Sequence, residues 1–446
     1  MNQDPVRRTV AYRAKRKAYL NMVLPAFLIS IIAYLDRNNL SYAKLTMNAE
    51  LGFTDANYGF GAGIFFAGYI LFEIPGALIA ERFSARLWLS RIMITWGFFT
   101  ALMAWVTQGW QFYALRFLIG AAEASLYPVL MATMIPRWFV AKDRAVAIAM
   151  IMASLPFSSV LGAPIAGWLI DTPWMGFQGW QVLFIVEAIP ALLLGLVVLV
   201  WLADRPESAW WLTEDEKDYF RQIHAEDTDW HEMSEDPGAS TQNIRSNTSK
   251  AHYTVWQALS DREVLKLCLT YFLWLTGYWG FNYFTPSLLK DQGWSNQASG
   301  WLFSAIMAMA TVVMLAVGYS SSRTGERRWH GASGMFLAAV GLFGGTMVSE
   351  PITAFLFLCA AGIGVYSAMG VWWSYPTTFL RGAAAAGAVG LINSVGNIGG
   401  FVGPTFTGTL KEWTGNYTLA WVLMSIFLAL AGLLVLTLRQ SKRPSR

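Results

Sequence analysis

Twelve runs of about 20 mostly apolar residues recur along the chain, and each has the length that an α-helix needs to cross the hydrocarbon core of a bilayer. The runs lie at residues 20–43, 58–80, 87–106, 112–135, 145–170, 182–202, 264–288, 298–319, 331–348, 352–373, 384–410 and 419–438. Hydrophobic residues make up 55% of the chain and charged residues only 13%, which is too little polar surface for a water-soluble protein. We therefore predict an all-α membrane protein with twelve transmembrane helices.

The longest polar stretch divides these runs into six and six. We predict an N-terminal six-helix bundle over residues 1–203, a cytoplasmic linker over 204–262 and a C-terminal six-helix bundle over 263–446. Within the linker, Thr213-Glu214-Asp215-Glu216 forms a capping box, which predicts a short surface helix. Two bundles of this kind are typical of transporters that move one bundle against the other around a central site.

Basic residues are distributed unevenly between the connecting segments. If the N-terminus is inside the cell, the cytoplasmic segments hold 25 of the 32 Lys and Arg residues, and the outward loops hold only Lys44, Lys290 and Lys411. Positive charge is enriched on the cytoplasmic side of membrane proteins. We predict a multi-pass protein of the cell (inner) membrane with both termini in the cytoplasm. The first apolar run is too long for a signal peptide, so we expect it to be retained.

Other function classes lack a sequence signal. Cys268 and Cys359 lie far apart in apolar runs, and the four histidines form no cluster, so we expect no metal and no cofactor. We find no nucleophile–base pair and expect no enzyme. The net charge of +4 is small and its basic residues are scattered, so we expect no nucleic-acid partner.

Charged residues inside the apolar runs are confined to the first half. A charge at mid-bilayer costs about 2.5–3.5 kcal/mol on insertion scales and therefore marks function. The interiors of the last six runs carry none, whereas the first six contain Asp36, Arg37, Glu73, Arg116, Glu123 and Glu187. We expect the ion chemistry in the first half and neutral polar contacts in the second.

Arg37 is the candidate for binding a carboxylate. It shares a helix face with Tyr34, three residues earlier, and its guanidinium has the fork geometry that a carboxylate prefers. These two residues therefore predict a substrate site in the first helix. The alternative is a structural ion pair between Arg37 and Asp36 or another acid.

Asp36 and Glu123 are the candidate proton carriers. Burial favours the neutral form of a carboxyl group and a nearby cation favours its charged form, so such a group can load and release a proton. Arg116, which shares a face with Glu123, is the expected partner of one of these acids. The alternative is a static charge network that holds the first and fourth helices together. Glu73 and Glu187 precede prolines, so we expect them to cap freed backbone groups.

In the second half, polar and aromatic groups near mid-membrane are candidates for substrate contacts. They are Tyr278 and Asn282 in the seventh run, Trp373 and Ser374 in the tenth, and Asn393 in the eleventh. An asparagine in a membrane helix can also simply hydrogen-bond another helix.

Four segments resemble those of the major facilitator superfamily and, within it, the anion:cation symporter family. They are YLDRNNLS at residues 34–41, RFLIGAAEA at 116–124, GWQ at 179–181 and DRP at 204–206. The resemblance implies two six-helix bundles and proton-coupled uptake of an organic anion, such as a sugar acid, a hydroxy-dicarboxylate or an aromatic carboxylate.

The resemblance also implies roles for single residues. Arg37 matches the cation that binds the substrate carboxylate, with Tyr69 beside it along with Tyr34. Asp36 and Glu123 match the protonation sites. Asn393, in the eleventh run, matches a substrate contact from the second half. The apolar residues 155–157 in the fifth run make a highly hydroxylated substrate less expected.

Two turns resemble the cytoplasmic gating motif of the family. Glu81, Arg82 and Arg86 follow the second run, and Arg323 and Arg327 follow the eighth. Glu81 stands where the family usually has Asp, so the gating contact is altered.

Together these features predict a proton-coupled symporter that imports a small carboxylate by alternating access. Its partners are the organic anion, protons and the lipid bilayer, and we expect a monomer. An organic anion exchanger or exporter with the same fold is the alternative. A membrane sensor that binds without transporting is a weaker alternative, because neither the linker nor the short basic tail is long enough to form a signalling domain.

Overall fold

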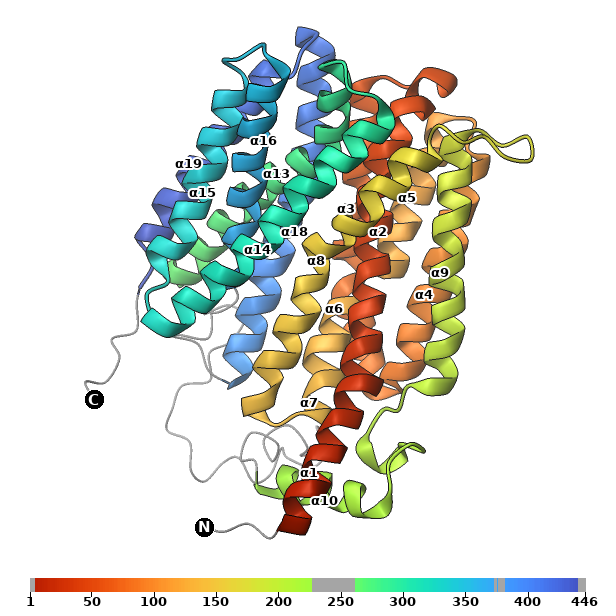
Figure 1. The fold of residues 1–446 in the computed structure, drawn as a ribbon, viewed down its shortest axis with the longest axis vertical. Coiled ribbons are helices and arrows are strands. Elements are labelled where there is room, and N and C mark those ends of the chain that lie inside the picture. Colours follow the sequence, from red (N-terminus) through yellow and green to blue (C-terminus); the bar gives the residue numbers. More distant parts are fainter. Residues whose placement is uncertain (1–4, 227–260, 373–374, 376–381, 440–446) are drawn as a thin grey trace.

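A computed structural model describes residues 5–226, 261–372, 375 and 382–439, and helices account for nearly all of them (Figure 1). The first half contains α1 (Pro5–Ala18), η1 (Tyr19–Val23), α2 (Leu24–Leu51), α3 (Asp55–Arg82), α4 (Ala85–Leu102), η2 (Met103–Trp105), α5 (Gly109–Glu123), α6 (Leu126–Pro128), η3 (Val129–Met134), α7 (Ile135–Trp138), α8 (Ala141–Leu169) and α9 (Gly179–Trp201). Helices satisfy their backbone hydrogen bonds internally, as a chain in lipid requires.

The connecting segment contains two short elements, and the second half is again helical. After η4 (Pro206–Ser208) and α10 (Glu214–Glu226), the second half contains α13 (Arg262–Asp291), α14 (Asn296–Thr324), α15 (Arg328–Gly345), α16 (Pro351–Ser367), α17 (Met369–Trp372), α18 (Gly382–Thr414) and α19 (Thr418–Leu436). Each of the twelve predicted runs thus corresponds to a helix or to a series of consecutive helices.

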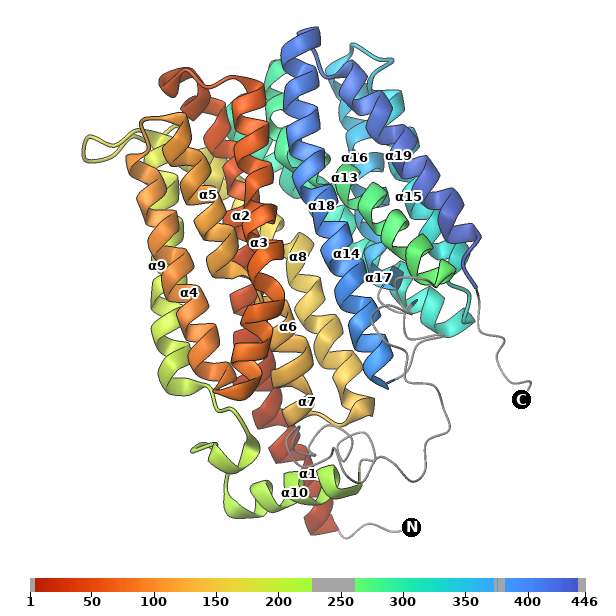
Figure 2. The ribbon, with the colours of Figure 1, turned by 180° about the vertical axis from the view of Figure 1, so that it is seen from behind.

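Among the described residues, nine helical segments have the length and hydropathy of a membrane span. The helices α13, α15 and α18 are less apolar, but they run beside the others in the same bundle (Figure 2). The prediction of an all-α membrane protein with two six-helix halves is confirmed.

Helix pairing repeats between the two halves. In the first half α2 packs on α8, α3 on α5 and α4 on α9, and in the second half α13 packs on α18, α14 on α16 and α15 on α19. Between the halves, α3 packs on α18 and α8 on α14. The order of partners is the same in both halves, so the fold is an internal repeat.

Small residues let the halves approach closely. A Cβ atom at Gly59 of α3 would lie 2.4 Å from the carbonyl oxygen of Pro404 in α18, and one at Gly300 of α14 would lie 2.5 Å from that of Ala163 in α8. Backbones of membrane helices meet in this way where side chains are absent. Any larger side chain at either glycine would push the two halves apart.

The fourth predicted run is broken rather than continuous. The α5 helix ends at Glu123, and Ser125 then adopts a left-handed conformation with φ 70° before α6 begins. The ring of Pro128 would clash with the carbonyl of Ala124 four residues earlier in an unbroken helix. The Trp88 indole donates a hydrogen bond to the Ser125 hydroxyl at 3.0 Å. The break therefore places Glu123 at a helix end.

The N-terminal helix and the linker helix pack together at one end of the molecule, which we call the inner end after the predicted orientation (Figure 1). The predicted surface helix is confirmed as α10, and the Thr213 N–H donates to Glu216 at 3.0 Å. Arg13 of α1 contacts Asp215 at 2.7 Å, and Lys17 contacts Glu216 at 2.7 Å. Charge pairs therefore fix α10 against α1.

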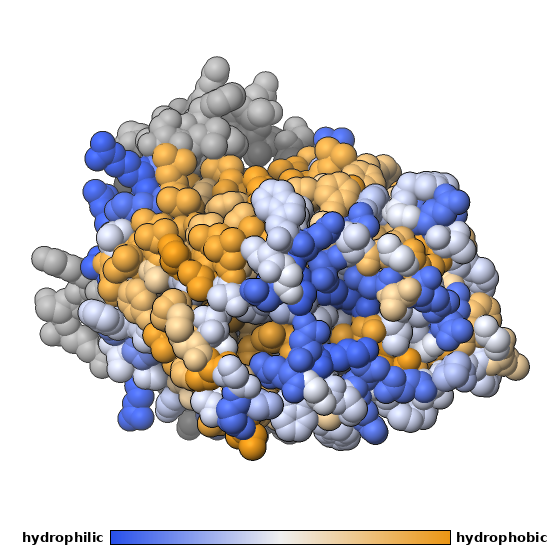
Figure 3. Space-filling model, turned by 90° about the horizontal axis from the view of Figure 1, so that it is seen from above, coloured by the Kyte–Doolittle hydropathy of each residue, from blue (hydrophilic) through white to orange (hydrophobic). Residues whose placement is uncertain are grey.

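Large apolar side chains cover the sides of the bundle. Leu71, Leu78, Val200, Val312 and Leu433 are all more than half exposed. A water-soluble monomer rarely exposes so much apolar surface, whereas lipid accepts it. The outer end is more polar than the sides. Seen from above, hydrophilic side chains gather across its middle and hydrophobic ones toward one edge (Figure 3).

Candidate substrate and proton site

Arg37 lies in the middle of α2 and is only 4% exposed. Its Nη2 atom lies 2.6 Å from Oε1 of Glu123, which is fully buried at the end of α5. A buried guanidinium–carboxylate pair is stable only while both partners stay charged and close, because loss of one partner leaves the other charge uncompensated. The ion pair that we considered as the alternative for Arg37 is therefore present, and its partner is Glu123.

Three aromatic rings surround the Arg37 guanidinium. Its central carbon lies 5.1 Å from the ring centre of Tyr34, 5.0 Å from that of Phe65 and 5.1 Å from that of Tyr69. Cation–π contacts of this kind hold a cation without neutralising it. The structure thus brings Tyr34 and Tyr69 to Arg37 as predicted, and it adds Phe65, for which the sequence carried no signal because apolar aromatics are common throughout the run.

One donor of Arg37 remains available. Its Nε atom is buried and has no hydrogen-bond partner among the described residues. Tyr34 also stacks on Trp279 of α13, with ring centres 6.3 Å apart and planes at 14°. The guanidinium is therefore held at the boundary between the two halves.

Asp36 points to different neighbours from Arg37. Its carboxylate accepts a hydrogen bond from the Trp96 indole of α4 at 2.9 Å, and it is 3% exposed. No ion pair joins Asp36 to Arg37 among the described residues, because Arg37 pairs with Glu123. Asp36 therefore lies inside the first half, between α2 and α4, and Trp96 is a contact that the sequence did not predict.

Arg116 is buried, but it does not pair with Glu123. Its nearest hydrogen-bond acceptors are the carbonyl of Gly61 and the hydroxyl of Tyr283, both at 3.4 Å. Its guanidinium also lies over Phe65, 4.9 Å from the ring centre. The structure therefore shows no direct ion pair of Arg116 with either candidate proton carrier, and the cation that holds Glu123 is Arg37.

The expected capping role of Glu73 and Glu187 is wrong. Glu73 accepts a hydrogen bond at 2.6 Å from the side-chain amide of Asn393, which belongs to the second half. Both carboxylate oxygens of Glu187 are buried without a hydrogen-bond partner among the described residues. Pro75 and Pro190 lie inside continuous helices, and the backbone group that each one frees is a carbonyl oxygen, which an acceptor such as a carboxylate cannot satisfy.

The predicted substrate contacts of α13 are engaged with their neighbours. The Tyr278 hydroxyl donates to the Tyr366 hydroxyl at 3.0 Å, which in turn donates to the Asn282 side chain at 2.9 Å. The Asn282 amide donates back to the carbonyl of Tyr278 at 2.7 Å. A substrate would have to exchange with this chain of hydrogen bonds. Trp373 and Ser374 lie outside the described residues.

The first gating turn is tied to the segment after α9. Asp204 accepts hydrogen bonds from the Ser84 hydroxyl at 2.6 Å and from the Arg86 backbone N–H at 2.9 Å. Glu81 and Arg82 are exposed at the surface of the inner end. The turn and the start of the linker are therefore joined to each other within the first half.

The second gating turn connects to the end of the tenth predicted span. Arg323 is exposed, and the backbone carbonyl of Arg327 accepts a hydrogen bond from the Tyr375 hydroxyl at 2.5 Å. This contact lies within the second half. The two turns resembling a gating motif are therefore each anchored inside their own half.

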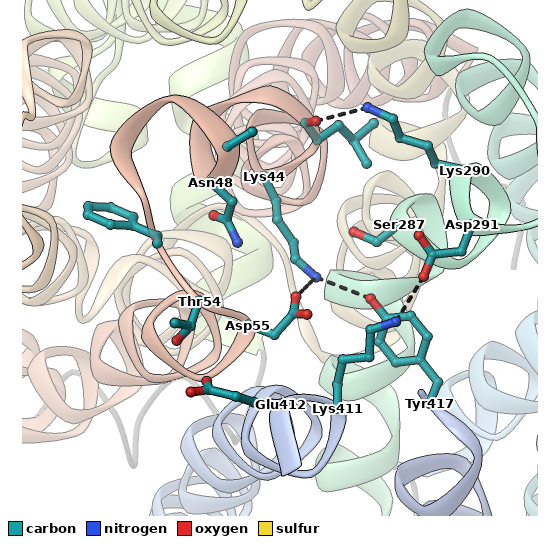
Figure 4. A pocket seen from close by; sticks show the side chains of 13 residues that line it. Lys44, Asn48, Thr54, Asp55, Ser287, Lys290, Asp291, Lys411, Glu412 and Tyr417 are labelled. Atoms are coloured by element: carbon teal, nitrogen blue, oxygen red, sulfur yellow. Dashed lines mark hydrogen bonds and ion pairs between the residues drawn. The ribbon is translucent and has the colours of Figure 1, made fainter. Parts of the chain in front are cut away.

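The three lysines of the outward loops converge on one pocket of about 560 Å³ at the outer end (Figure 4). Lys44 contacts Asp55 at 2.6 Å and the Tyr417 hydroxyl at 3.2 Å, while Lys290 donates to a backbone carbonyl of α2 at 2.9 Å. Lys411 pairs with Asp291 at 3.0 Å. The contacts of Lys44 with Tyr417 and of Lys290 with α2 join the two halves at this end.

Comparisons with known proteins agree with this architecture. The family model of the Major Facilitator Superfamily matches residues 26–404. A "Putative tartrate transporter" of Agrobacterium vitis is 40% identical over 407 residues, which cover 91% of this chain and 90% of that protein. A "Quinolone resistance transporter" of Acinetobacter baumannii is 34% identical over 407 residues, with the same coverage of 91% and 90%.

A solved structure has a similar fold. A bacterial homologue of the human lysosomal transporter Spinster, in an inward-facing and unoccupied conformation, aligns over 100% of both chains with a TM-score of 0.75 and 17% sequence identity. At this identity the likeness concerns the arrangement of the helices.

Proposed function

The chain belongs to the Major Facilitator Superfamily, and on that premise we propose that it is a proton-coupled symporter that imports a small organic anion. The family makes it a membrane transporter of an organic substrate, residing in a cell membrane. The name of the 40% identical relative makes a hydroxy-dicarboxylate such as tartrate the first candidate substrate. The proposal adds three points to this family assignment: inward transport, coupling to protons and a preference for carboxylates.

The ion pair of Arg37 and Glu123 is the observation that carries this proposal. A substrate carboxylate that binds Arg37 competes with Glu123 for the same guanidinium. Protonation of Glu123 removes the competing charge, because a neutral carboxyl group no longer attracts the cation. Anion binding and proton binding at this site therefore favour each other, as symport requires.

The geometry around Arg37 supports anion capture in a second way. Its unpartnered Nε can donate to a second carboxylate oxygen, which gives the two-point contact that a guanidinium offers. The rings of Tyr34 and Tyr69 keep the guanidinium in place when protonation of Glu123 breaks the ion pair. Asn393 supplies a neutral donor from the second half.

The remaining parts of the proposal follow from charge and topology. Asp36, whose carboxylate accepts a hydrogen bond from Trp96, is the second proton site. Because moving one net charge through 100 mV is worth about 2.3 kcal/mol, protons must outnumber the negative charges of the substrate if the membrane potential is to drive uptake. The carrier acts as a monomer with both termini in the cytoplasm, and its halves meet the linker at residues 203 and 263.

Export is the second candidate. It is favoured by the relative that is a quinolone resistance transporter at 34% identity. In an exporter of the same fold, protons would enter the cell while the substrate leaves it. The two candidates therefore differ in whether substrate moves with the proton gradient or against it.

Transport by the purified protein in liposomes tests the proposal. With radiolabelled tartrate outside and an inward proton gradient, we expect accumulation that a protonophore abolishes. Uptake that is unchanged when the proton gradient is collapsed would exclude symport. Accumulation only when the proton gradient points outward would establish exchange in place of symport.

A further inference from the structure

The hydrogen bond between Glu73 and Asn393 is a polar contact between the two halves beside the candidate substrate site. Glu73 lies one helical turn after Tyr69 in α3, so both side chains share a face, and Tyr69 covers Arg37. Asn393 lies in α18 and donates to Oε1 of Glu73 at 2.6 Å. The contact therefore connects the Arg37 site to the residue expected to bind substrate in the second half.

Glu73 has few other partners. It is 4% exposed, and its Oε2 atom is buried without a hydrogen-bond partner among the described residues. The titratable groups that interact with it electrostatically are Arg37 of α2, Tyr69 of its own helix and Tyr271 of α13. Arg37 is the single cation in this set, and Glu123 already holds it. The amide of Asn393 is thus the main stabiliser of the Glu73 carboxylate.

We propose that Glu73 occupies the place of the substrate in the empty carrier, and that an anion which binds Arg37 and Asn393 displaces Glu73 and causes it to take up one proton. This inference rests on the proposed function, because it assigns a third titratable group to the same site. The proton comes from the solution to which the site is open, and it returns to solution after the substrate has left.

Two physical effects act in the same direction. An incoming carboxylate repels the Glu73 carboxylate, because like charges interact strongly where water is excluded. Once Asn393 turns to the substrate, Glu73 also loses its hydrogen bond and becomes a buried carboxylate without a donor. An unpaired buried carboxylate is unstable as an ion and neutralises. Substrate binding therefore favours protonated Glu73.

Glu187 provides a matched control within the same chain. It is also a buried carboxylate of a membrane helix in the first half, 5% exposed, but the described residues give it no hydrogen bond to the second half. A glutamine has nearly the same shape as glutamate and cannot ionise. Glu73→Gln and Glu187→Gln thus differ only in whether the removed charge lies at the contact between the halves.

The test measures proton uptake when tartrate binds to the purified full-length protein, with a pH-indicating dye in weak buffer. We expect Glu73→Gln to take up about one proton fewer per bound tartrate than wild type, whereas Glu187→Gln is unchanged. Each proton that is linked to binding changes the affinity for tartrate by about tenfold per pH unit, so the slope for Glu73→Gln should be smaller by one proton, while the contribution of Glu123 remains. An unchanged proton count and slope in Glu73→Gln would overturn the inference.

Infrared difference spectra give a second measurement that does not depend on affinity. Addition of tartrate should produce carbonyl bands of protonated carboxyl groups in wild type and in Glu187→Gln, and Glu73→Gln should lack the component that belongs to Glu73 while keeping that of Glu123. A Glu73→Gln spectrum with the same carbonyl bands as wild type would also overturn the inference.

Arg37→Ala separates this inference from the proposed function. If Arg37→Ala binds tartrate as well as wild type, the proposed substrate site is wrong and the Glu73 inference falls with it. If Arg37→Ala abolishes binding while Glu73→Gln keeps the full proton count, only the inference about Glu73 fails.

Discussion

The guanidinium of Arg37 in α2 and the carboxylate of Glu123 at the end of α5 form a buried ion pair with an N–O distance of 2.6 Å. Both residues come from the first half, and the ring of Tyr34 connects this pair to Trp279 of the second half. Under the proposed function, the cation that binds the anionic substrate is thus held by an acid that a proton can neutralise. This relationship determines the behaviour expected of several variants.

Replacement of Glu123 by glutamine should separate binding from coupling. Because the competing charge is removed, Glu123→Gln should bind tartrate at least as tightly as wild type and with weaker pH dependence. It should exchange substrate between equal pools but fail to accumulate it against a gradient. Counterflow and uptake in the same liposomes measure the two activities. Normal concentrative uptake would exclude Glu123 as a proton carrier.

Replacement of Arg37 by alanine should abolish substrate binding. Removal of one partner of a buried charge pair costs about 2–5 kcal/mol, so the affinity should fall by at least about 30-fold. A thermal-shift screen against a panel of carboxylates measures the loss. Arg323→Ala, which changes an exposed arginine of the second half, is the control and should keep the wild-type response. Equal shifts in both variants would contradict the assignment of Arg37.

The lysine pocket at the outer end should hold the two halves together. Lys44 contacts Asp55 of its own half and Tyr417 of the other, so Lys44→Ala should favour opening of this end. A cysteine introduced as Ser287→Cys, in a background without Cys268 and Cys359, reports on access from outside through its labelling rate. We expect faster labelling by a membrane-impermeant maleimide when Lys44 is replaced. An unchanged rate would show that Lys44 does not restrain this end.

The contact between α1 and α10 should make stability depend on pH. Burial acts to raise the pKa of Glu216, but hydrogen bonds from Lys17 and Thr213 outweigh it and hold the pKa below its usual value. A lowered pKa in the folded state stabilises the protein above the unfolded pKa of about 4.3, and this contribution is lost as the pH falls through the folded value.

Glu216→Gln should therefore destabilise the protein at neutral pH by about 1–3 kcal/mol, the range for a hydrogen bond to a charged group. The difference from wild type should shrink below about pH 4, as measured by thermal unfolding in detergent. Glu214→Gln, which changes an exposed neighbour in the same helix, should have little effect. A difference that stays constant down to acidic pH would refute the role of the Glu216 charge.

The sequence predicted the helices well because their main determinant is local. A run of apolar residues needs no distant partner to become a helix in lipid, since its backbone hydrogen bonds are made within the run. The surface helix α10 was equally predictable, because its capping box lies within four residues. The break in the fourth run beside Glu123 was only partly visible, through Pro128.

The partners of the buried charges were not predictable in this way. Sequence spacing placed Arg116 and Glu123 on one face, but Glu123 pairs with Arg37, and the contact of Glu73 is with Asn393 at a separation of 320 residues. Phe65 and Trp96 gave no signal, because aromatic residues are frequent in every run. Such contacts depend on how the helices are rotated against one another.

The sequence by itself determined that this chain spans a membrane in two six-helix halves, and that the charged residues inside its apolar runs belong to the first half. Both conclusions follow from the composition of each segment, because the segment's own hydrophobicity decides whether it enters the lipid. Only the tertiary structure decided which acid holds Arg37, which donor holds Glu73 and how three distant lysines meet at the outer end. Those choices arise from packing between helices, where the distance between two atoms is independent of their separation in sequence.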